Sequence, residues 1–85
     1  MIEVFKTNVI NRTDADRLIE AIHKLYTEHK ATFDLEDCDK ILRVKSIGDV
    51  YADDIIELVK DFGFNAEVLP DELAPARSYF YYAGL

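Results

Sequence analysis

Few residues in this chain belong to the types that perform catalysis or hold soft metal ions. The chain has one cysteine, Cys38, and two histidines, His23 and His29. If both histidines lie on one helix, their spacing separates them by about 600° of rotation, so they do not share a face as a metal-clamping pair would. The serines, Ser46 and Ser78, lie outside any Gly-x-Ser-x-Gly motif, and the chain has no glycine-rich phosphate loop. The sequence therefore predicts no catalytic residue, no cofactor and no enzymatic activity.

Acidic residues surround the cysteine in the sequence. A calcium-binding loop would need a glycine and a bidentate glutamate at set positions, and this run has neither. We therefore interpret Cys38 as a turn residue and the carboxylates as a solvated acidic edge. The carboxylates of this run are Asp34, Glu36, Asp37 and Asp39.

The composition limits the classes of partner. The 85 residues are 49% hydrophobic and carry a net charge of −7, which fits one compact domain with an acidic surface. Such a surface repels phosphate backbones and anionic lipids, so we expect neither nucleic acid nor membrane as partner. A single cysteine cannot form an internal disulfide, and residues 1–6 do not resemble a secretion signal. We therefore expect a cytoplasmic protein.

The spacing of apolar residues predicts the elements that must position any site. Alternation predicts four strands, and apolar spacings of three and four predict two helices. Thr13 and Asp16 resemble a capping box for the first helix, and Gly63 is typical of a residue just past a helix end. The strands are expected at Ile2–Val9, Thr32–Glu36, Lys40–Lys45 and Phe64–Leu69, and the helices at Asp14–His29 and from between Asp49 and Ala52 to Phe62.

The order of these elements is βαββαβ, which predicts an α+β fold of the ferredoxin-like type. Two right-handed crossovers place both helices on one face of a four-stranded antiparallel sheet. Residues 1–70 would form this domain, and residues 71–85 would be an aromatic C-terminal tail. The expected core is Val4, Phe5, Val9, Leu18, Ile22, Leu25, Phe33, Leu35, Leu42, Val44, Ile55, Val59, Phe62, Ala66 and Val68.

Three segments of the chain resemble the heavy-metal-associated domain, the small module of copper chaperones and metal-transporting ATPases. They are residues 18–22, residues 33–35 and, above all, residues 55–68, whose sequence IIELVKDFGFNAEV is similar to the family's second helix, glycine, aromatic residue and last strand. The resemblance covers roughly residues 2–69 and implies the same fold.

The resemblance also implies where a metal would be bound, in a Met-x-Cys-x-x-Cys loop before the first helix. Aligned on the helix, the methionine position falls at Val9 and the two cysteine positions at Asn11 and Asp14. An amide and a carboxylate are poor ligands for Cu(I), so this loop is a degenerate metal loop and we expect no metal there. We interpret Asn11 and Asp14 as residues of the turn and the helix N-terminus. Cys38 is expected at the opposite end of the sheet, where it could not replace the missing thiols.

The tail holds an aromatic run that does not normally stay in water. We expect these residues to make an interaction, either along the open face of the chain's own sheet or in a homodimer. The predicted function is a small non-catalytic interaction module with an unknown protein partner. Two alternatives stay open: a metal-binding or metallochaperone-like protein that uses non-cysteine ligands, and a small-molecule regulatory domain. The aromatic run is Tyr79, Phe80, Tyr81 and Tyr82.

Overall fold

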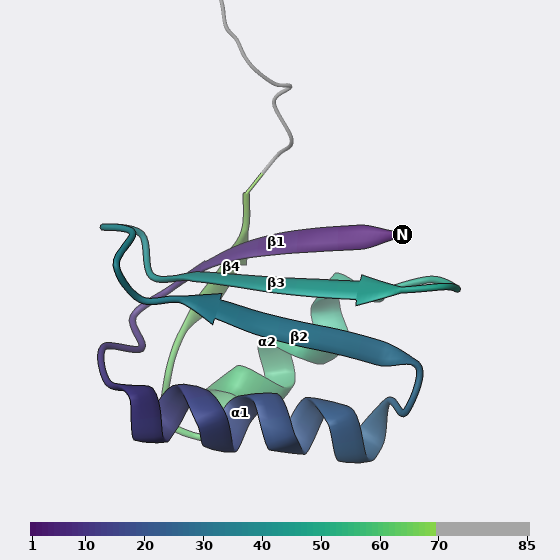
Figure 1. Cartoon of the computed structure of the whole chain (residues 1–85), viewed down its shortest axis with the longest axis horizontal. Helices are drawn as coiled ribbons and strands as arrows, with labels where there is room; N and C mark the ends of the chain where they lie inside the picture. Colours follow the sequence, from purple (N-terminus) through teal and green to yellow (C-terminus); the bar gives the residue numbers. More distant parts are fainter. Residues whose placement is uncertain (70–85) are drawn as a thin grey trace, which may run out of the picture.

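The computed structural model describes residues 1–69, and these residues form the ferredoxin-like βαββαβ fold that the sequence predicts (Figure 1). The expected boundary at residue 70 and the tail that follows lie outside the described residues. Neither helix of the described part has the length and apolar character needed to cross a membrane. The elements are β1 (Ile2–Thr7), α1 (Arg12–Leu25), β2 (His29–Asp34), β3 (Ile41–Ser46), α2 (Ala52–Asp61) and β4 (Ala66–Val68).

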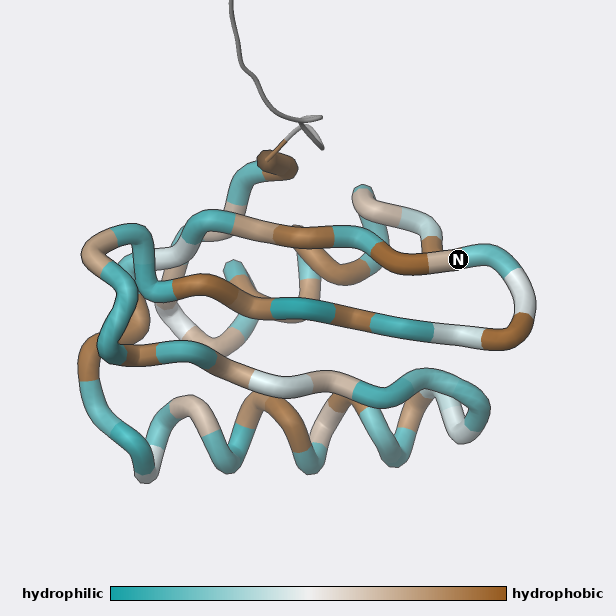
Figure 2. The backbone as a smooth tube through the Cα atoms, turned by 45° about the horizontal axis from the view of Figure 1, so that its top comes forward, coloured by the Kyte–Doolittle hydropathy of each residue, from teal (hydrophilic) through white to brown (hydrophobic). Residues whose placement is uncertain are grey.

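The four strands form one antiparallel sheet in the order β2-β3-β1-β4. Its register aligns Phe5 of β1 with Leu42 of β3 and Val68 of β4. Side chains alternate between the two faces of a strand, and Figure 2 shows hydrophilic and hydrophobic residues alternating along much of β3. Among residues 1–69, the helices cover one face of the sheet and no other element covers the second face, which we call the open face.

The core lies between that covered face and the helices, largely as expected. Most of the expected residues are buried, while Leu35, Phe62 and Ala66 are partly buried against them. The buried residues that were expected are Phe5, Val9, Leu18, Ile22, Phe33, Leu42, Val44, Ile55 and Val59. Those that were not expected are Ala15, Ala31, Ile41 and Val50, together with the polar Thr7.

Two residues of the expected core are wrong. Leu25 is 63% exposed, because Tyr26, four residues after Ile22, takes the place on the core side of the helix. Val68 is 40% exposed, because it belongs to a three-residue strand at the edge of the sheet. Val4 is half-buried, but on the open face rather than under the helices.

The largest error in the expected boundaries concerns the end of α1. The helix ends at Leu25, where the N–H of Tyr26 donates to the carbonyl of Ile22. The N–H of His29 then donates to the carbonyl of Tyr26, which closes a tight turn into β2. His29 is therefore the first residue of a strand and not the end of a helix, and β2 starts three residues earlier than expected.

Candidate functional site

The connection between β1 and α1 is the place where the resemblance puts a metal loop. The side chain of Val9 in this connection is fully buried in the core, whereas its neighbour Ile10 is 72% exposed. The N–H of Val9 donates to the hydroxyl of Thr7 at 3.2 Å, and that hydroxyl donates to the carbonyl of Lys40 at 2.6 Å. The connection is therefore held in shape by contacts within the protein.

The side chains at the two cysteine-like positions are bonded to each other. The amide oxygen of Asn11 accepts a hydrogen bond from the N–H of Asp14 at 2.8 Å, and its amide nitrogen donates to the Asp14 carboxylate, also at 2.8 Å. This is a reciprocal cap, with Asn11 as the N-cap residue of α1. The expected cap at Thr13 and Asp16 is wrong, since both residues lie inside the helix and Asp16 pairs with Arg12.

This donor set does not fit the metal that the resemblance implies. Cu(I) is a soft ion that favours sulfur, and Asn11 and Asp14 offer an amide and a carboxylate. The Asn11 amide oxygen already accepts from one of the first backbone N–H groups, which have no partner within the helix, and the Asp14 carboxylate accepts from the Asn11 side chain. A metal ion at this point would compete with the cap for two hard oxygen ligands.

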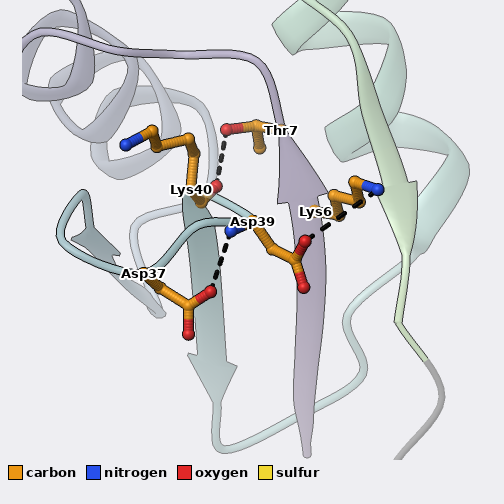
Figure 3. Close-up of polar contacts among 5 residues, drawn as sticks. All are labelled: Lys6, Thr7, Asp37, Asp39 and Lys40. Carbon is orange, nitrogen blue, oxygen red and sulfur yellow. Dashed lines mark hydrogen bonds and ion pairs between the residues drawn. The ribbon is translucent and has the colours of Figure 1, made fainter.

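The hairpin that carries Cys38 lies at the same end of the sheet as this connection, so the expected placement at the opposite end is wrong. The antiparallel register sets Lys6, near the end of β1, beside Ile41 at the start of β3. The N–H of Thr7 donates to the carbonyl of Asp39 at 3.1 Å, and the Lys6 ammonium lies 3.9 Å from the Asp39 carboxylate (Figure 3). Both connections are seen at the left of Figure 1.

The acidic residues of the hairpin shape its backbone. The Asp34 carboxylate accepts from the N–H groups of Glu36 and Asp37, and the Asp37 carboxylate accepts from the N–H of Asp39 at 2.8 Å. Short acidic side chains commonly bond their own backbone in this way in turns. The expected turn is thus confirmed, and these carboxylates have a structural role.

Asp37, Cys38 and Asp39 also form a cluster whose ligand atoms lie within 4.8 Å of one another. The cluster offers one thiol and two carboxylates at the surface. A zinc site commonly takes four ligands, and Ca²⁺ takes six to eight oxygens. Three exposed groups are short of either requirement, although they bring a thiol to the end of the sheet where the resemblance places a metal.

The two histidines are held apart by the secondary structure. The Nε2 atom of His23, on the exposed side of α1, accepts from the N–H of Ala31 at 3.0 Å and so ties the helix to β2. The His29 ring stacks on Tyr26 with its centroid 5.0 Å away, beside an open hollow of about 280 Å³ that Asp49 and Tyr51 also line. The two histidines make separate contacts, and the expectation that they form no metal clamp stays a prediction.

Thr7 is the residue of this site that sequence reasoning missed. It connects both loops, because its hydroxyl bonds the first loop at Val9 and the hairpin at Lys40. The signal was present in the sequence, since a polar residue stands at an inward position of an apolar alternation. The expected interaction residues, Tyr79 to Tyr82, lie outside the part of the chain that the structure describes.

Comparison with known proteins supports the fold. No protein-family model matches the chain, and no curated protein sequence matches it either. Among solved structures it is similar to the yeast copper transporter domain CCC2A, determined in solution in its apo and Cu(I)-loaded states. The two share 21% sequence identity and superpose with a TM-score of 0.69, over 82% of this chain and 96% of that chain. This likeness shows a common fold.

Proposed function

We propose that this protein is a non-catalytic interaction module that has the frame of a heavy-metal-associated domain without its thiolate metal site. The observation that carries this proposal is the reciprocal cap between Asn11 and Asp14, which occupies both side chains at the cysteine-like positions. The domain folds and acts without a metal ion, in the cytoplasm, and its contacts are with polypeptide.

Three further observations support this reading. The loop is anchored by a buried valine and by the Thr7 hydroxyl, so it needs no ion to close it. The core is continuous from both helices to the sheet among the described residues. A solved structure of similar fold is a copper transporter domain determined in its apo and Cu(I)-loaded states. This fold can therefore bind a metal ion when suitable ligands are present.

Restoring the thiols tests the alignment on which this proposal rests. In the double variant Asn11→Cys with Asp14→Cys, two thiols stand at the start of α1, where the positive end of the helix favours thiolates. We expect this variant to bind Cu(I) under reducing conditions. At a free metal concentration 100 times the dissociation constant, binding would stabilise the fold by about 2.7 kcal/mol. Thermal melts with and without metal measure this gain.

The matched control is Arg12→Cys with Asp14→Cys, which introduces two thiols at a different spacing. We expect it to gain much less from Cu(I) than the first variant. If the two double variants bind Cu(I) equally, the loop is not aligned as we propose. If the unmodified chain already gains stability from Cu(I), and the Cys38→Ser variant keeps this gain, the proposed loss of the metal site is wrong.

A second candidate function is metal binding through the hairpin, and the placement of Cys38 favours it. Because the hairpin and the β1–α1 connection share one end of the sheet, the hairpin cluster presents a thiol and two carboxylates there. Cys38→Ser removes the soft ligand and leaves the turn bonds of Asp37 intact. Any Zn²⁺ affinity of the unmodified chain that falls at least tenfold in this variant would place the metal at the hairpin.

The partner contacts that we propose involve the tail, whose aromatic residues are Tyr79, Phe80, Tyr81 and Tyr82. The sequence suggests two alternatives for these residues, contact with the open face of the chain's own sheet or a homodimer. The mass of the full chain in solution, compared with a chain in which all four are replaced by serine, tests the homodimer. A dimer that becomes a monomer on this replacement would establish the homodimer.

A further inference from the structure

The open face of the sheet carries a basic and apolar surface on an otherwise acidic protein. The register places residues of three strands side by side in two rows on this face. One row has Lys30, Lys45 and Ile2 next to one another, and the other has Thr32, Arg43 and Val4. Leu69 extends the second row, because its N–H donates to the carbonyl of Val4 at 2.8 Å. We call these seven residues the open-face patch.

Within residues 1–69, no ion pair neutralises the positive charges of the open-face patch, and the acidic side chain that lines a hollow with Lys30 and Lys45 is Glu28. The ion pairs among these residues join Lys6 to Asp39 and Arg12 to Asp16, and neither belongs to the patch. The third row of the same face differs, since there Lys6 stands beside Glu67 of β4 and close to Asp39. The sheet therefore neutralises its charge at the hairpin end only.

Lys30 and Lys45 are direct cross-strand neighbours. Like charges at such positions destabilise a sheet, because their side chains stand about 5 Å apart on one face. An open hollow of about 170 Å³ lies beside this pair; Glu28 lines it without an ion pair to either lysine, and Ile47 at its edge is almost fully exposed. An acidic side chain in this place would turn an unfavourable pair into a favourable one.

The apolar side chains of the open-face patch are also partly exposed to solvent among the described residues. Ile2 is 43% exposed, and Val4 and Leu69 are half-buried. Ile41, the other aliphatic residue of this face, is already buried and takes no part in the patch. A segment that pairs with the basic residues of the patch and also covers its apolar residues must carry both carboxylates and aromatic or aliphatic side chains.

We propose that the occupant is this chain's own segment of residues 71–82. The segment begins two residues after Leu69 in the sequence, and Leu69 is the last described residue and belongs to the patch. Its first two residues are Asp71 and Glu72, and its last four are the aromatic run. Carboxylates pair with the lysines, and aromatic rings cover Ile2 and stack on the Arg43 guanidinium.

The reach of the segment agrees with this placement. If the antiparallel register of β1 and β4 continued two residues past Leu69, Asp71 would stand level with Ile2 and Lys45. The four-stranded sheet is about 14 Å wide at a strand spacing of about 4.8 Å. The residues from 70 to 85 span up to about 50 Å when extended, which is enough to cross the face and turn once.

A spin label on the tail of the full chain tests this proposal. The variant combines Cys38→Ser with Ala83→Cys, so that a nitroxide attaches at position 83 alone. We expect the amide signals of Ile2, Val4 and Lys45 to lose most of their intensity and to regain it when the label is reduced. The amides of Glu20 and Glu57, on the helices, keep theirs. Equal broadening on both sides of the molecule, or none, would overturn the proposal.

A mixed sample separates the chain's own tail from that of a second copy. Spin-labelled chains without ¹⁵N are mixed with ¹⁵N chains that carry no spin label. Broadening of the open-face amide signals in this sample would show that the occupant comes from another molecule. That result would also overturn the proposal. Lys30→Glu with Lys45→Glu should abolish the broadening in the labelled chain. The matched pair Lys24→Glu with Lys60→Glu, on the helices, should leave it unchanged. If both pairs act alike, net charge rather than the open-face patch is responsible.

Discussion

The two connections that lead from a strand into a helix occupy equivalent places in the two halves of the fold, yet they are built differently. Each buries a valine shortly before its helix, Val9 before α1 and Val50 before α2. The first then caps its helix with the Asn11 side chain. The second has Tyr51 as N-cap residue, with no side-chain hydrogen bond to the helix.

The two connections also lie at opposite ends of the sheet. The first is tied to the hairpin through Thr7 and Asp39, whereas the second lies next to the N-terminus, where the N–H of Val50 approaches the Met1 sulfur at 3.3 Å. Each connection thus has two features, a buried valine and the polar side chains at the start of the helix. The buried valine occurs in both connections and packs in the core of the fold. The polar side chains at the helix start differ between the two connections. At Asn11 and Asp14, these side chains hold the helix end.

The buried valine of the first connection should show the largest effect. Val9→Ala removes two methylene equivalents from a fully buried position, at about 0.8 kcal/mol each, and adds a cavity term. We expect the free energy of unfolding to fall by about 2–3 kcal/mol in denaturant titrations. Ile10→Ala, at the exposed neighbouring position, should change it by less than about 0.5 kcal/mol. Equal losses at the two positions would contradict the anchoring role of Val9.

Loss of the cap should show an intermediate effect. Asn11→Ala removes both hydrogen bonds to Asp14 and should lower the free energy of unfolding by about 1 kcal/mol. Tyr51→Ala is the matched change in the second connection, where no side-chain cap is lost, and it should cost clearly less. Thermal melts of the two variants compare the connections directly. An equal cost would mean that the Asn11 bonds contribute nothing to stability.

A cap added to the second connection should show the smallest effect, of opposite sign. Tyr51→Asn places a good N-cap residue before α2, and we expect a gain of about 0.5 kcal/mol in the free energy of unfolding. Tyr51→Leu is the control, because it changes the exposed side chain without offering an acceptor. A gain of the same size in the control would assign the effect to lost aromatic surface.

The sequence predicts much of the frame, because apolar periodicity reports directly on which side of an element is buried. The apolar residues spaced three and four apart predicted both helices. The alternation around Phe5 in one strand, and around Leu42 and Val44 in another, predicted strands, and together they led to the correct fold. Gly63 was expected in a left-handed conformation just past α2, and its φ of 90° confirms this. The alignment of Asn11 and Asp14 with the thiol positions of a metal loop remains a prediction.

The errors came from properties that depend on tertiary contacts. The helix pattern continues through Tyr26 without glycine or proline, so nothing local marks the end of α1 at Leu25. The capping partner of Asn11 was missed because Thr13 and Asp16 show the same spacing two residues later. The hairpin was placed at the wrong end of the sheet although the order of elements settles its position: a crossover makes β2 parallel to β1, so the connections that follow these two strands share one end. The patch on the open face depends on strand register, which single strands do not encode.

Titration of the unmodified full chain with Cu(I) and with Zn²⁺, followed by amide NMR under reducing conditions, tests the central claim most directly. We predict that the amides of residues 9–14 keep their positions through one equivalent of either metal, and that a chelator leaves the melting temperature unchanged. Saturable shifts confined to residues 9–14 would contradict the account, because they would show that the loop before α1 still holds a metal ion.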